Sequence, residues 1–313
     1  MGPVPGAKTP AIARWACGAY SVIRHGRQKR LVIAMSNESG NKAGPLAIVT
    51  GAARGIGAAI AQRLSDAGYA VALWDFNAEE AASTAAQMTA SGRQVISARV
   101  DVADEELVEA ATRAAQATFG APCLLVNNAG IRHREPLEDL RRTSWEREIA
   151  TNLTGPFVCT QIVGRLMLAA GSGAIVNIAS MSGSYGQAMR GAYTPSKAGI
   201  IGLTSLTAVE WGGRGIRCNA ISPGMISTPA HVEAYSNEEL MAAREAMIPA
   251  GRVGEGNDIA DVVVFLASDA ARYINGANIP VDGGVTKALI ALMPIPTANG
   301  ELDTTLGQLG LRP

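Results

Sequence analysis

The 313-residue sequence is poor in cysteine, histidine and aromatic residues, and it carries no net charge. Its four cysteines are Cys17, Cys123, Cys159 and Cys218, and its three histidines are His25, His133 and His231. The cysteines are far apart and form no CxxC pair, which excludes a zinc ribbon or a disulfide framework, so we expect reduced thiols. Three unclustered histidines offer no zinc or iron site either, and no metal is expected.

An excess of charge of one sign is also missing, because 27 basic and 27 acidic residues balance. A balanced chain has no overall field that would attract nucleic acid. The balance is uneven along the chain. Residues 1–44 hold seven Lys or Arg residues and one acid, Glu38, which leaves 20 basic and 26 acidic residues in 45–313. We interpret this basic leader as a disordered extension, or as sequence upstream of a true start at Met35, rather than as an organellar presequence.

Long hydrophobic runs are absent as well. No stretch approaches the ~18 apolar residues that a membrane span needs, and no apolar block follows the basic leader residues as in a signal peptide. At the same time 48% of the residues are hydrophobic and only 17% are charged. That composition excludes a disordered chain and provides for a large core. Together these features predict a cytoplasmic globular protein.

From residue 46 onward, short apolar runs alternate with longer helical stretches. The runs are Leu46–Thr50, Ala70–Asp75, Val95–Val100, Cys123–Asn127, Ala174–Ala179, Ile216–Ile221 and Ala277–Val281. Short runs that are almost entirely apolar are typical of strands buried on both faces of a parallel sheet. The pattern predicts an α/β fold, a single doubly wound Rossmann-type domain over 45–284 with a seven-stranded parallel sheet flanked by helices. Residues 285–313 form a C-terminal extension that we expect to pack on the body or on a second subunit.

A glycine-rich turn follows the first predicted strand. It reads Thr50-Gly51-Ala52-Ala53-Arg54-Gly55-Ile56-Gly57, and a helix is predicted to begin directly after it. Glycines allow a tight turn and the close approach of a pyrophosphate, and the start of the helix offers unpaired N–H groups to the phosphate oxygens. Because ligands bind beyond the carboxyl ends of the strands in such sheets, this turn predicts a dinucleotide site.

The second predicted strand ends in Asp75, 18 residues after Gly57. A carboxylate at this place accepts hydrogen bonds from the adenosine ribose hydroxyls and repels a 2′-phosphate, which favours NAD over NADP. Arg54 in the glycine turn is the opposing observation, because its guanidinium could pair with a 2′-phosphate. We give Asp75 the greater weight, since the Arg54 side chain can point outward into solvent.

With these motifs the sequence resembles the short-chain dehydrogenase/reductase family, and the resemblance covers residues 45–284. The family's turn has the form TGxxxGxG, as in Thr50–Gly57. Its further marks follow in order near the predicted strand ends: Asp101-Val102, Asn127-Asn128-Ala129-Gly130, Asn152, Ser180, Tyr193 with Lys197, Pro223-Gly224-Met225-Ile226-Ser227-Thr228 and Val281-Asp282-Gly283-Gly284. A YxxxK pair alone is weak, but the ordered set is very specific.

The resemblance implies a nicotinamide coenzyme, which we expect to be NAD, and a set of residues that bind it. The set is Gly51, Arg54, Gly55, Ile56, Gly57, Asp75, Asp101, Val102, Asn128, Ala129, Gly130, Tyr193, Lys197, Gly224, Ile226 and Thr228. Asp101 and Val102 would contact the adenine, Lys197 would grip the nicotinamide ribose, and Ile226 and Thr228 would bind the carboxamide.

The same resemblance implies four catalytic residues, Ser180, Tyr193, Lys197 and Asn152. Tyr193 and Lys197 are four residues apart, so on a helix both side chains lie on one face. A tyrosine hydroxyl is a poor base at neutral pH, and the nearby ammonium favours its phenolate form. Tyr193 would then take the proton of an alcohol during hydride transfer, or return it in the reverse direction. Ser180 would position the reacting oxygen, and Asn152 would bind a water that links Lys197 to solvent.

Substrate contacts are predicted for a set around the reacting oxygen: Ser180, Tyr193, Met181, Gln187 and Met225. Tyr185 and His231 are further pocket candidates, and residues 225–251 would form a mobile lid over the cleft. The basic trio Arg132-His133-Arg134 follows the fourth strand and could face an anionic substrate. A solvated loop is the interpretation that we favour for it.

We therefore predict an oxidoreductase that transfers a hydride between NAD(H) and a small-molecule alcohol or carbonyl substrate, with no nucleic acid or membrane as partner. The alternatives are an NADPH-dependent reductase of the 3-oxoacyl-carrier-protein type and, from a different class, an inactive dinucleotide-binding sensor. A sensor is expected to have lost Ser180, Tyr193 or Lys197, and all three are present. The resemblance also implies a homotetramer, or at least a homodimer built on the predicted helices Glu105–Phe119 and Thr143–Ala170.

Overall fold

The computed structural model describes residues 43–228, 238–288, 295–296 and 302–303. Several features singled out in the sequence lie outside the described residues. These are the basic leader up to residue 42 with Met35, the pocket candidate His231, part of the predicted lid, and most of the C-terminal extension.

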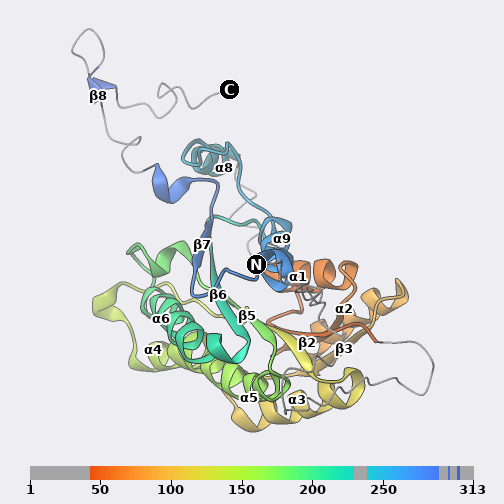
Figure 1. The fold of residues 1–313 in the computed structure, drawn as a ribbon. Coiled ribbons are helices and arrows are strands. Elements are labelled where there is room, and N and C mark those ends of the chain that lie inside the picture. Colours follow the sequence, from red (N-terminus) through yellow and green to blue (C-terminus); the bar gives the residue numbers. More distant parts are fainter. Residues whose placement is uncertain (1–42, 229–237, 289–294, 297–301, 304–313) are drawn as a thin grey trace, which may run out of the picture.

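Seven parallel strands form one sheet in the order β3-β2-β1-β4-β5-β6-β7 (Figure 1). They are β1 Leu46–Thr50, β2 Ala70–Asp75, β3 Val95–Arg99, β4 Pro122–Asn127, β5 Gly173–Ile178, β6 Ile216–Pro223 and β7 Asn278–Val281. The predicted fold class, a doubly wound Rossmann-type sheet, is confirmed. The strand order reverses between β1 and β4, and ligands bind at such a switch point, outside the carboxyl ends of the strands.

Helices cover both faces of the sheet. One face is covered by α1 Gly55–Asp66, α2 Ala78–Ala90 and α9 Gly256–Ala267. The other is covered by α3 Glu105–Phe119, α5 Gly155–Ala170 and α6 Tyr193–Trp211. The remaining helical elements are η1 Leu137–Asp139, α4 Arg142–Ile149, the π-helical η2 Ala150–Thr154, η3 Met181–Gly183, η4 Gly212–Arg214, α8 Glu238–Ala246, η6 Asp269–Ala271 and η7 Val285–Lys287. A separate antiparallel pair joins β8 Ile295–Pro296 to β9 Leu302–Asp303.

Local sequence explains where the helices begin and how closely they pack. The Asn77 side chain accepts a hydrogen bond from Glu80 N at the start of α2, and the Asp104 side chain accepts one from Leu107 N at the start of α3. Both satisfy N–H groups that have no partner inside the helix. At Gly155, a Cβ would lie 2.6 Å from Val102 Cγ2, so only glycine lets α5 approach the end of β3 this closely.

A buried polar network joins the middle strands to the helices. Asn177 on β5 accepts a hydrogen bond from Asn127 Nδ2 at 2.8 Å and donates to Thr204 Oγ1 on α6 at 2.9 Å. Asn127 Nδ2 also donates to Thr160 Oγ1 on α5 at 3.2 Å. Burial of unpaired amides is costly, so these bonds fix the helices on this face relative to β4 and β5.

Helical residues Arg142–Ala170 are long and apolar enough to cross a membrane, with a mean hydropathy of 1.3 over their most apolar window. This is weak support for a membrane span. The buried side chains of α5, among them Cys159, Val163 and Met167, belong to the core under the sheet. They therefore contact protein rather than lipid.

The cysteines match the expectation in part. Cys159 and Cys218 are buried free thiols, as expected, whereas Cys123 is disulfide-bonded. The expectation of four reduced thiols is wrong for Cys123, because spacing along the chain excludes a CxxC site but does not say which sulfur atoms the fold brings together.

Candidate active site

The glycine turn between β1 and α1 leaves no room for a side chain at two of its positions, Gly51 and Gly57. A Cβ on Gly51, whose φ is 62°, would lie 2.7 Å from Ala129 Cα, and a Cβ on Gly57 would lie 2.0 Å from Gly51 O. The residue that precedes α1, Arg54, makes no side-chain cap to the first turn of the helix. The turn thus presents bare backbone and uncapped N–H groups, the arrangement that pyrophosphate binding requires.

Two side chains that lie at strand ends tie this turn to β4. Thr50 Oγ1 accepts hydrogen bonds from Asn128 N and Ala129 N, both at 3.0 Å. The Asn128 amide donates to Thr50 O at 3.0 Å and to Gly51 O at 2.9 Å. Asn128 therefore shapes the turn, which agrees with a stabilising role for this motif, and its part in coenzyme binding stays a prediction. Thr50 is not among the predicted site residues, although its position directly before Gly51 is a signal in the sequence that could have indicated its role in the turn.

Asp75 ends β2 next to the turn, as predicted. Its carboxylate accepts hydrogen bonds from Ala53 N at 3.0 Å and from Asn77 N at 2.9 Å. The Arg54 side chain is 63% exposed, and its Nη1 lies 3.5 Å from Glu80 Oε1 in the first turn of α2. The acid thus lies against the glycine turn, and the opposing cation is paired elsewhere.

Asp101 and Val102 follow β3 and take part in packing. Asp101 accepts hydrogen bonds from Ala103 N at 3.1 Å and from Arg147 Nη2 at 3.0 Å. Val102 is buried against Gly155. Arg147 also stacks over the exposed ring of Phe76, with its guanidinium carbon 5.9 Å from the ring centroid. The Asp101 carboxylate is therefore held in place by Arg147 on α4 and by the backbone N–H of Ala103, two residues further along.

Tyr193 and Lys197 lie on the first two turns of α6, on one face. Lys197 Nζ lies 5.7 Å from the centroid of the Tyr193 ring and donates a hydrogen bond to Ile178 O, at the end of β5, at 2.7 Å. Burial lowers the pKa of Lys197 to about 8, because its ammonium has lost most of its hydration. At neutral pH most of it is still an ammonium, held directly beside the tyrosine.

Ser180 follows β5 by two residues and is buried. Its Oγ accepts a hydrogen bond from Ser182 N at 3.1 Å and so caps the short helix η3. Ser182 Oγ in turn donates to Gln187 Oε1 at 2.9 Å. Of the predicted substrate contacts in this segment, Met181 is half-buried and Gln187 is exposed. The further candidate Tyr185 is 41% exposed.

Asn152 lies in the π-helical segment between α4 and α5 and is fully buried. Its Oδ1 accepts from Ile131 N and its Nδ2 donates to Ile131 O, both at 2.8 Å, and Nδ2 also donates to Ser196 Oγ at 3.3 Å. A Cβ on Gly130 would lie 3.3 Å from Asn152 Oδ1 and 3.7 Å from Lys197 Nζ. The structure thus brings Gly130, Asn152 and Lys197 together, and the water linked to Asn152 stays a prediction. π-Helical turns are frequently found at functional sites.

The segment after β6 lies against the glycine turn. A Cβ on Gly55 would lie 3.5 Å from Thr228 Cβ, and Ile226 forms a bridge with Gly254. At Gly224 a Cβ would lie 2.7 Å from Asp282 Cα, so this strand end and the last motif of the chain are in close contact. Met225 lines a cavity of about 110 Å³ together with Ile226, Ile248 and Asp282.

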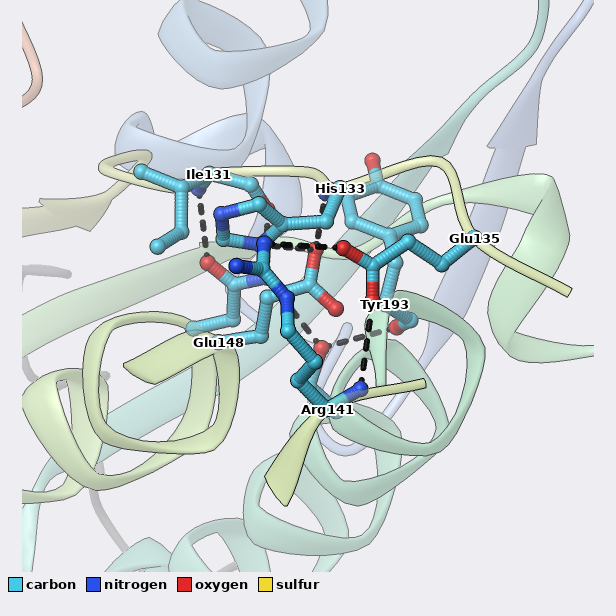
Figure 2. A network of polar contacts seen from close by, with 8 residues as sticks. Ile131, His133, Glu135, Arg141, Glu148 and Tyr193 are labelled. Atoms are coloured by element: carbon cyan, nitrogen blue, oxygen red, sulfur yellow. Dashed lines mark hydrogen bonds and ion pairs between the residues drawn. The ribbon is translucent and has the colours of Figure 1, made fainter. Parts of the chain in front are cut away.

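A buried acid near the site was not singled out in the sequence. Glu148 on α4 is fully buried, accepts a hydrogen bond from His133 N, and has its Oε1 3.4 Å from His133 Nδ1 (Figure 2). Arg132 and Arg134 are exposed, as expected for a solvated loop, but His133 is half-buried. The His133 side chain is still 38% exposed, so the solvated-loop interpretation stays a prediction. The signal in the sequence was the spacing of Glu148 and Asn152, which are four residues apart on one helical face.

Residues 51–286 match the family model described as enoyl-(acyl carrier protein) reductase. The chain is 44% identical over 243 residues to D-threitol dehydrogenase of Mycolicibacterium smegmatis, which covers 78% of this chain and 93% of that protein. The chain belongs to the short-chain dehydrogenase/reductase family. The expected family membership is confirmed, and with it the assignment to the oxidoreductase class.

Further relatives of this family have different substrates in their names. The chain is 43% identical to cis-4-hydroxycyclohexanecarboxylate dehydrogenase of Sinomonas cyclohexanicum, over 77% of this chain and 96% of that protein. Among solved structures, a gluconate 5-dehydrogenase from Burkholderia cenocepacia in complex with NADP and tartrate is similar, with a TM-score of 0.75 and 34% identity over 79% of this chain and 97% of that one. Members of the family with similar folds therefore differ in substrate, and at least one binds NADP.

Proposed function

We propose that this short-chain dehydrogenase/reductase is an NAD-dependent alcohol dehydrogenase or carbonyl reductase that uses Tyr193 as general acid and base. The observation that carries the proposal is the placement of the buried Lys197 ammonium 5.7 Å from the Tyr193 ring, on the helix that begins beyond β5. Ser180, at the end of the same strand, and Asn152, beside Gly130, complete the proposed catalytic set. The relatives named above are dehydrogenases of a polyol and of a hydroxy acid, which supports a secondary alcohol or the matching ketone as substrate.

The residues at the switch point fit a nicotinamide dinucleotide. Gly51 and Gly57 leave bare backbone where a Cβ would collide with the neighbouring chain, so the turn has the shape of a pyrophosphate cradle. Thr228, which would bind the carboxamide, lies beside this turn. When bound, the coenzyme supplies the C4 position that exchanges the hydride with the substrate carbon.

The chain's own residues would handle the proton and the geometry. Tyr193 would accept the proton of the substrate hydroxyl, with the Lys197 ammonium held beside its ring. In the reverse direction the Tyr193 hydroxyl would donate a proton to the carbonyl oxygen. Ser180 would donate a hydrogen bond to the same oxygen, which orients it toward Tyr193 and stabilises the charge that develops on it. Lys197 keeps its place because Ile178 O accepts one of its protons.

The choice of NAD over NADP rests on the pairing of charges around the adenosine ribose end. Asp75 keeps a carboxylate against the glycine turn, where a 2′-phosphate would be repelled. Arg54, the cation that could offset it, is paired with Glu80. We therefore infer that NADH binds more tightly than NADPH, although a solved relative binds NADP.

Titration of the purified protein with NADH and with NADPH, followed by nicotinamide fluorescence, tests the coenzyme. Tighter binding of NADH supports the proposal, and tighter binding of NADPH would favour the 3-oxoacyl-carrier-protein type of reductase instead. Turnover of secondary alcohols with NAD, measured for the wild type and for Tyr193→Phe, tests the chemistry. The variant is expected to bind NADH normally and to lose turnover. Normal turnover by Tyr193→Phe would refute the role of Tyr193, and the absence of any turnover in the wild type would favour the sensor.

We also propose that residues 45–284 form the catalytic domain of a cytoplasmic homotetramer or homodimer. Trp145 on α4 is 38% exposed and Phe157 on α5 is 47% exposed, both within the stretch expected to form an interface. Large apolar side chains at a surface are typical of subunit contacts. The molar mass in solution, measured by light scattering after gel filtration, tests the oligomeric state, and a value near 32 kDa would refute it.

A further inference from the structure

Two segments that flank the proposed catalytic site meet at one buried carboxylate. Glu148 Oε1 accepts a hydrogen bond from His133 N, in the segment after β4. On the other side, a Cβ on Gly191, two residues before Tyr193, would lie 3.4 Å from Glu148 Oε2. Asn152, one turn further along the same helix, binds both backbone groups of Ile131. The segment after β4 and the turn before α6 are therefore held next to each other, and Figure 2 shows Tyr193 beside them.

Three arginines lie on these two segments. Arg132 and Arg134 come from the first segment and Arg190 from the second. Burial lowers the pKa of Arg190, the charges of Arg132 and Arg134 lower it further, and Tyr193 acts in the opposite direction. Arg190 is thus half-buried and lies within electrostatic range of Arg132, Arg134 and Tyr193.

The nearby carboxylates are occupied by other partners. Glu135 accepts hydrogen bonds from Arg141 N at 3.2 Å and from Arg141 Nη2 at 3.0 Å. Glu148 is held by His133, as described above. Within the described residues, no carboxylate forms an ion pair with Arg134 or Arg190. Like charges held together in a half-buried place are unfavourable, and an anion placed between them removes the repulsion.

These arginines lie near Tyr193, where the substrate is proposed to react, and away from the turn that is proposed to bind the coenzyme phosphates. Tyr193 N donates a hydrogen bond to Arg190 O at 2.9 Å, so Arg190 lies in the turn that leads into the catalytic residue. The glycine turn, by contrast, follows β1, and Asp75 follows β2, which is two strands from β4 in the sheet. A 2′-phosphate at the Asp75 end would therefore be remote from the arginines.

We propose that Arg134 and Arg190, together with the positive charge of Arg132, bind an anionic oxygen group of the substrate, a carboxylate or a sulfonate, beside Tyr193. The inference rests on the proposed function, which places the alcohol or carbonyl group of the same molecule at Tyr193. Guanidinium groups suit this role because their planar N–H donors match the oxygen pairs of such anions. The substrate is thus a hydroxy acid or an oxo acid rather than a neutral polyol.

Matched ketone probes that differ in charge test this binding. Suitable probes are 4-oxopentanoate, its neutral amide 4-oxopentanamide, and 3-oxobutane-1-sulfonate, which distinguishes the sulfonate from the carboxylate. Their dissociation constants for the complex of the enzyme with NAD are measured by titration calorimetry. The oxidised coenzyme has no hydride to donate to a ketone, so the result does not depend on turnover. At least one anion is expected to bind about tenfold or more tightly than the amide, as for one charge-assisted hydrogen-bond pair. The two anions compared with each other identify the preferred head group.

Charge-removing variants locate the site. Arg134→Gln and Arg190→Gln are each expected to weaken binding of the preferred anion about tenfold while they change the amide by less than threefold. The matched control is Arg272→Gln, an exposed arginine that precedes the edge strand β7, outside the two segments that carry the proposed site. It is expected to change neither probe. Circular dichroism of each variant verifies that the fold is intact.

Each outcome is decisive. Equal affinity for the anions and the amide, an unchanged preference in both arginine variants, or binding of none of the probes overturns the inference. The proposed function is judged separately, by turnover of neutral secondary alcohols with NAD. An enzyme that oxidises these alcohols and shows no preference for anions would therefore refute the anion site and leave the dehydrogenase assignment in place.

Discussion

The buried ammonium of Lys197 links the stability of this protein to pH. Burial lowers the pKa of Lys197 from 10.5 to about 8, and Nζ keeps a hydrogen bond to Ile178 O. Between these two values the unfolded chain still binds the proton that the folded chain has released. The free energy of unfolding therefore rises with pH in this range, because the unfolded state binds more protons. Below pH 8 the cost of the buried charge is fully present.

The size of the effect follows from the same values. At 1.36 kcal/mol for each pKa unit, a change from 10.5 to about 8 costs the folded state about 3.4 kcal/mol at low pH. Between pH 7 and pH 9.5 about 2 kcal/mol of this cost is relieved. Replacement by methionine, which has a similar length and no charge, removes the dependence on this group. The stability of the wild type minus that of Lys197→Met is thus expected to increase by about 2 kcal/mol over this interval.

Urea denaturation of both proteins at pH 7 and at pH 9.5, followed by circular dichroism, measures this difference. Cys159 and Cys218 act in the opposite direction above about pH 9, since burial raises the pKa of both thiols to about 12. They are present in both proteins, so their effect cancels in the difference. Lys287→Met is the matched control, because Lys287 is exposed. Its difference from the wild type is expected to be the same at both pH values.

The reasoning would be refuted if the difference in unfolding free energy between the wild type and Lys197→Met were the same at pH 7 and pH 9.5 to within about 0.5 kcal/mol. It would mean that water or a partner charge stabilises the ammonium in the folded protein as well as bulk solvent does. The proposed catalytic role of Lys197 beside Tyr193 is a separate matter and is tested by turnover. The methionine variant is expected to lose activity even where its stability matches that of the wild type.

Substitutions at three further positions test the geometry. Gly57→Ala would place a Cβ 2.0 Å from Gly51 O, so NADH binding is expected to weaken at least tenfold in a fluorescence titration, and normal affinity would contradict the cradle. Asn177→Leu removes the buried hydrogen bonds to Asn127, Thr204 and Cys218 and is expected to lower the unfolding free energy by about 3 kcal/mol, measured by urea denaturation, with a change below 1 kcal/mol as the refuting result. Glu148→Leu removes the acceptor of His133 N, so the segment that carries His133 loses its anchor, and KM is expected to rise about tenfold with a smaller change in kcat. Glu148→Gln keeps an oxygen that can accept this hydrogen bond, and its KM is expected to equal that of the wild type. Equal KM values in both Glu148 variants would refute the positioning role.

The sequence by itself determined the sheet and the order of its motifs. The strands predicted at Leu46–Thr50 and Ala70–Asp75 are observed with the same bounds, because buried parallel strands consist of short apolar runs and end at glycine or polar residues. The end of Ile216–Ile221 was placed two residues early, since β6 extends to Pro223. Proline is tolerated at that place because it lies at the end of the strand.

Only the tertiary structure decided how residues remote in sequence share their charges and hydrogen bonds. Arg54 could be interpreted in two ways until the fold placed Glu80 next to it. Asn128 is a family mark in the sequence, but its bonds to Thr50 and Gly51 require two strands to lie side by side. The pKa of Lys197 likewise depends on burial, which no local pattern reports.

The meeting of Arg190 with the basic segment after β4 is of the same kind. More than 50 residues separate them in the sequence, and the buried carboxylate of Glu148 brings their backbones together. Local residue patterns determine secondary structure because backbone preferences and hydrophobic periodicity act over a few residues. Electrostatic interactions depend on distance in space and on the exclusion of water. For that reason the sequence predicted the positions of the site residues, and the fold decided which of their charges are paired.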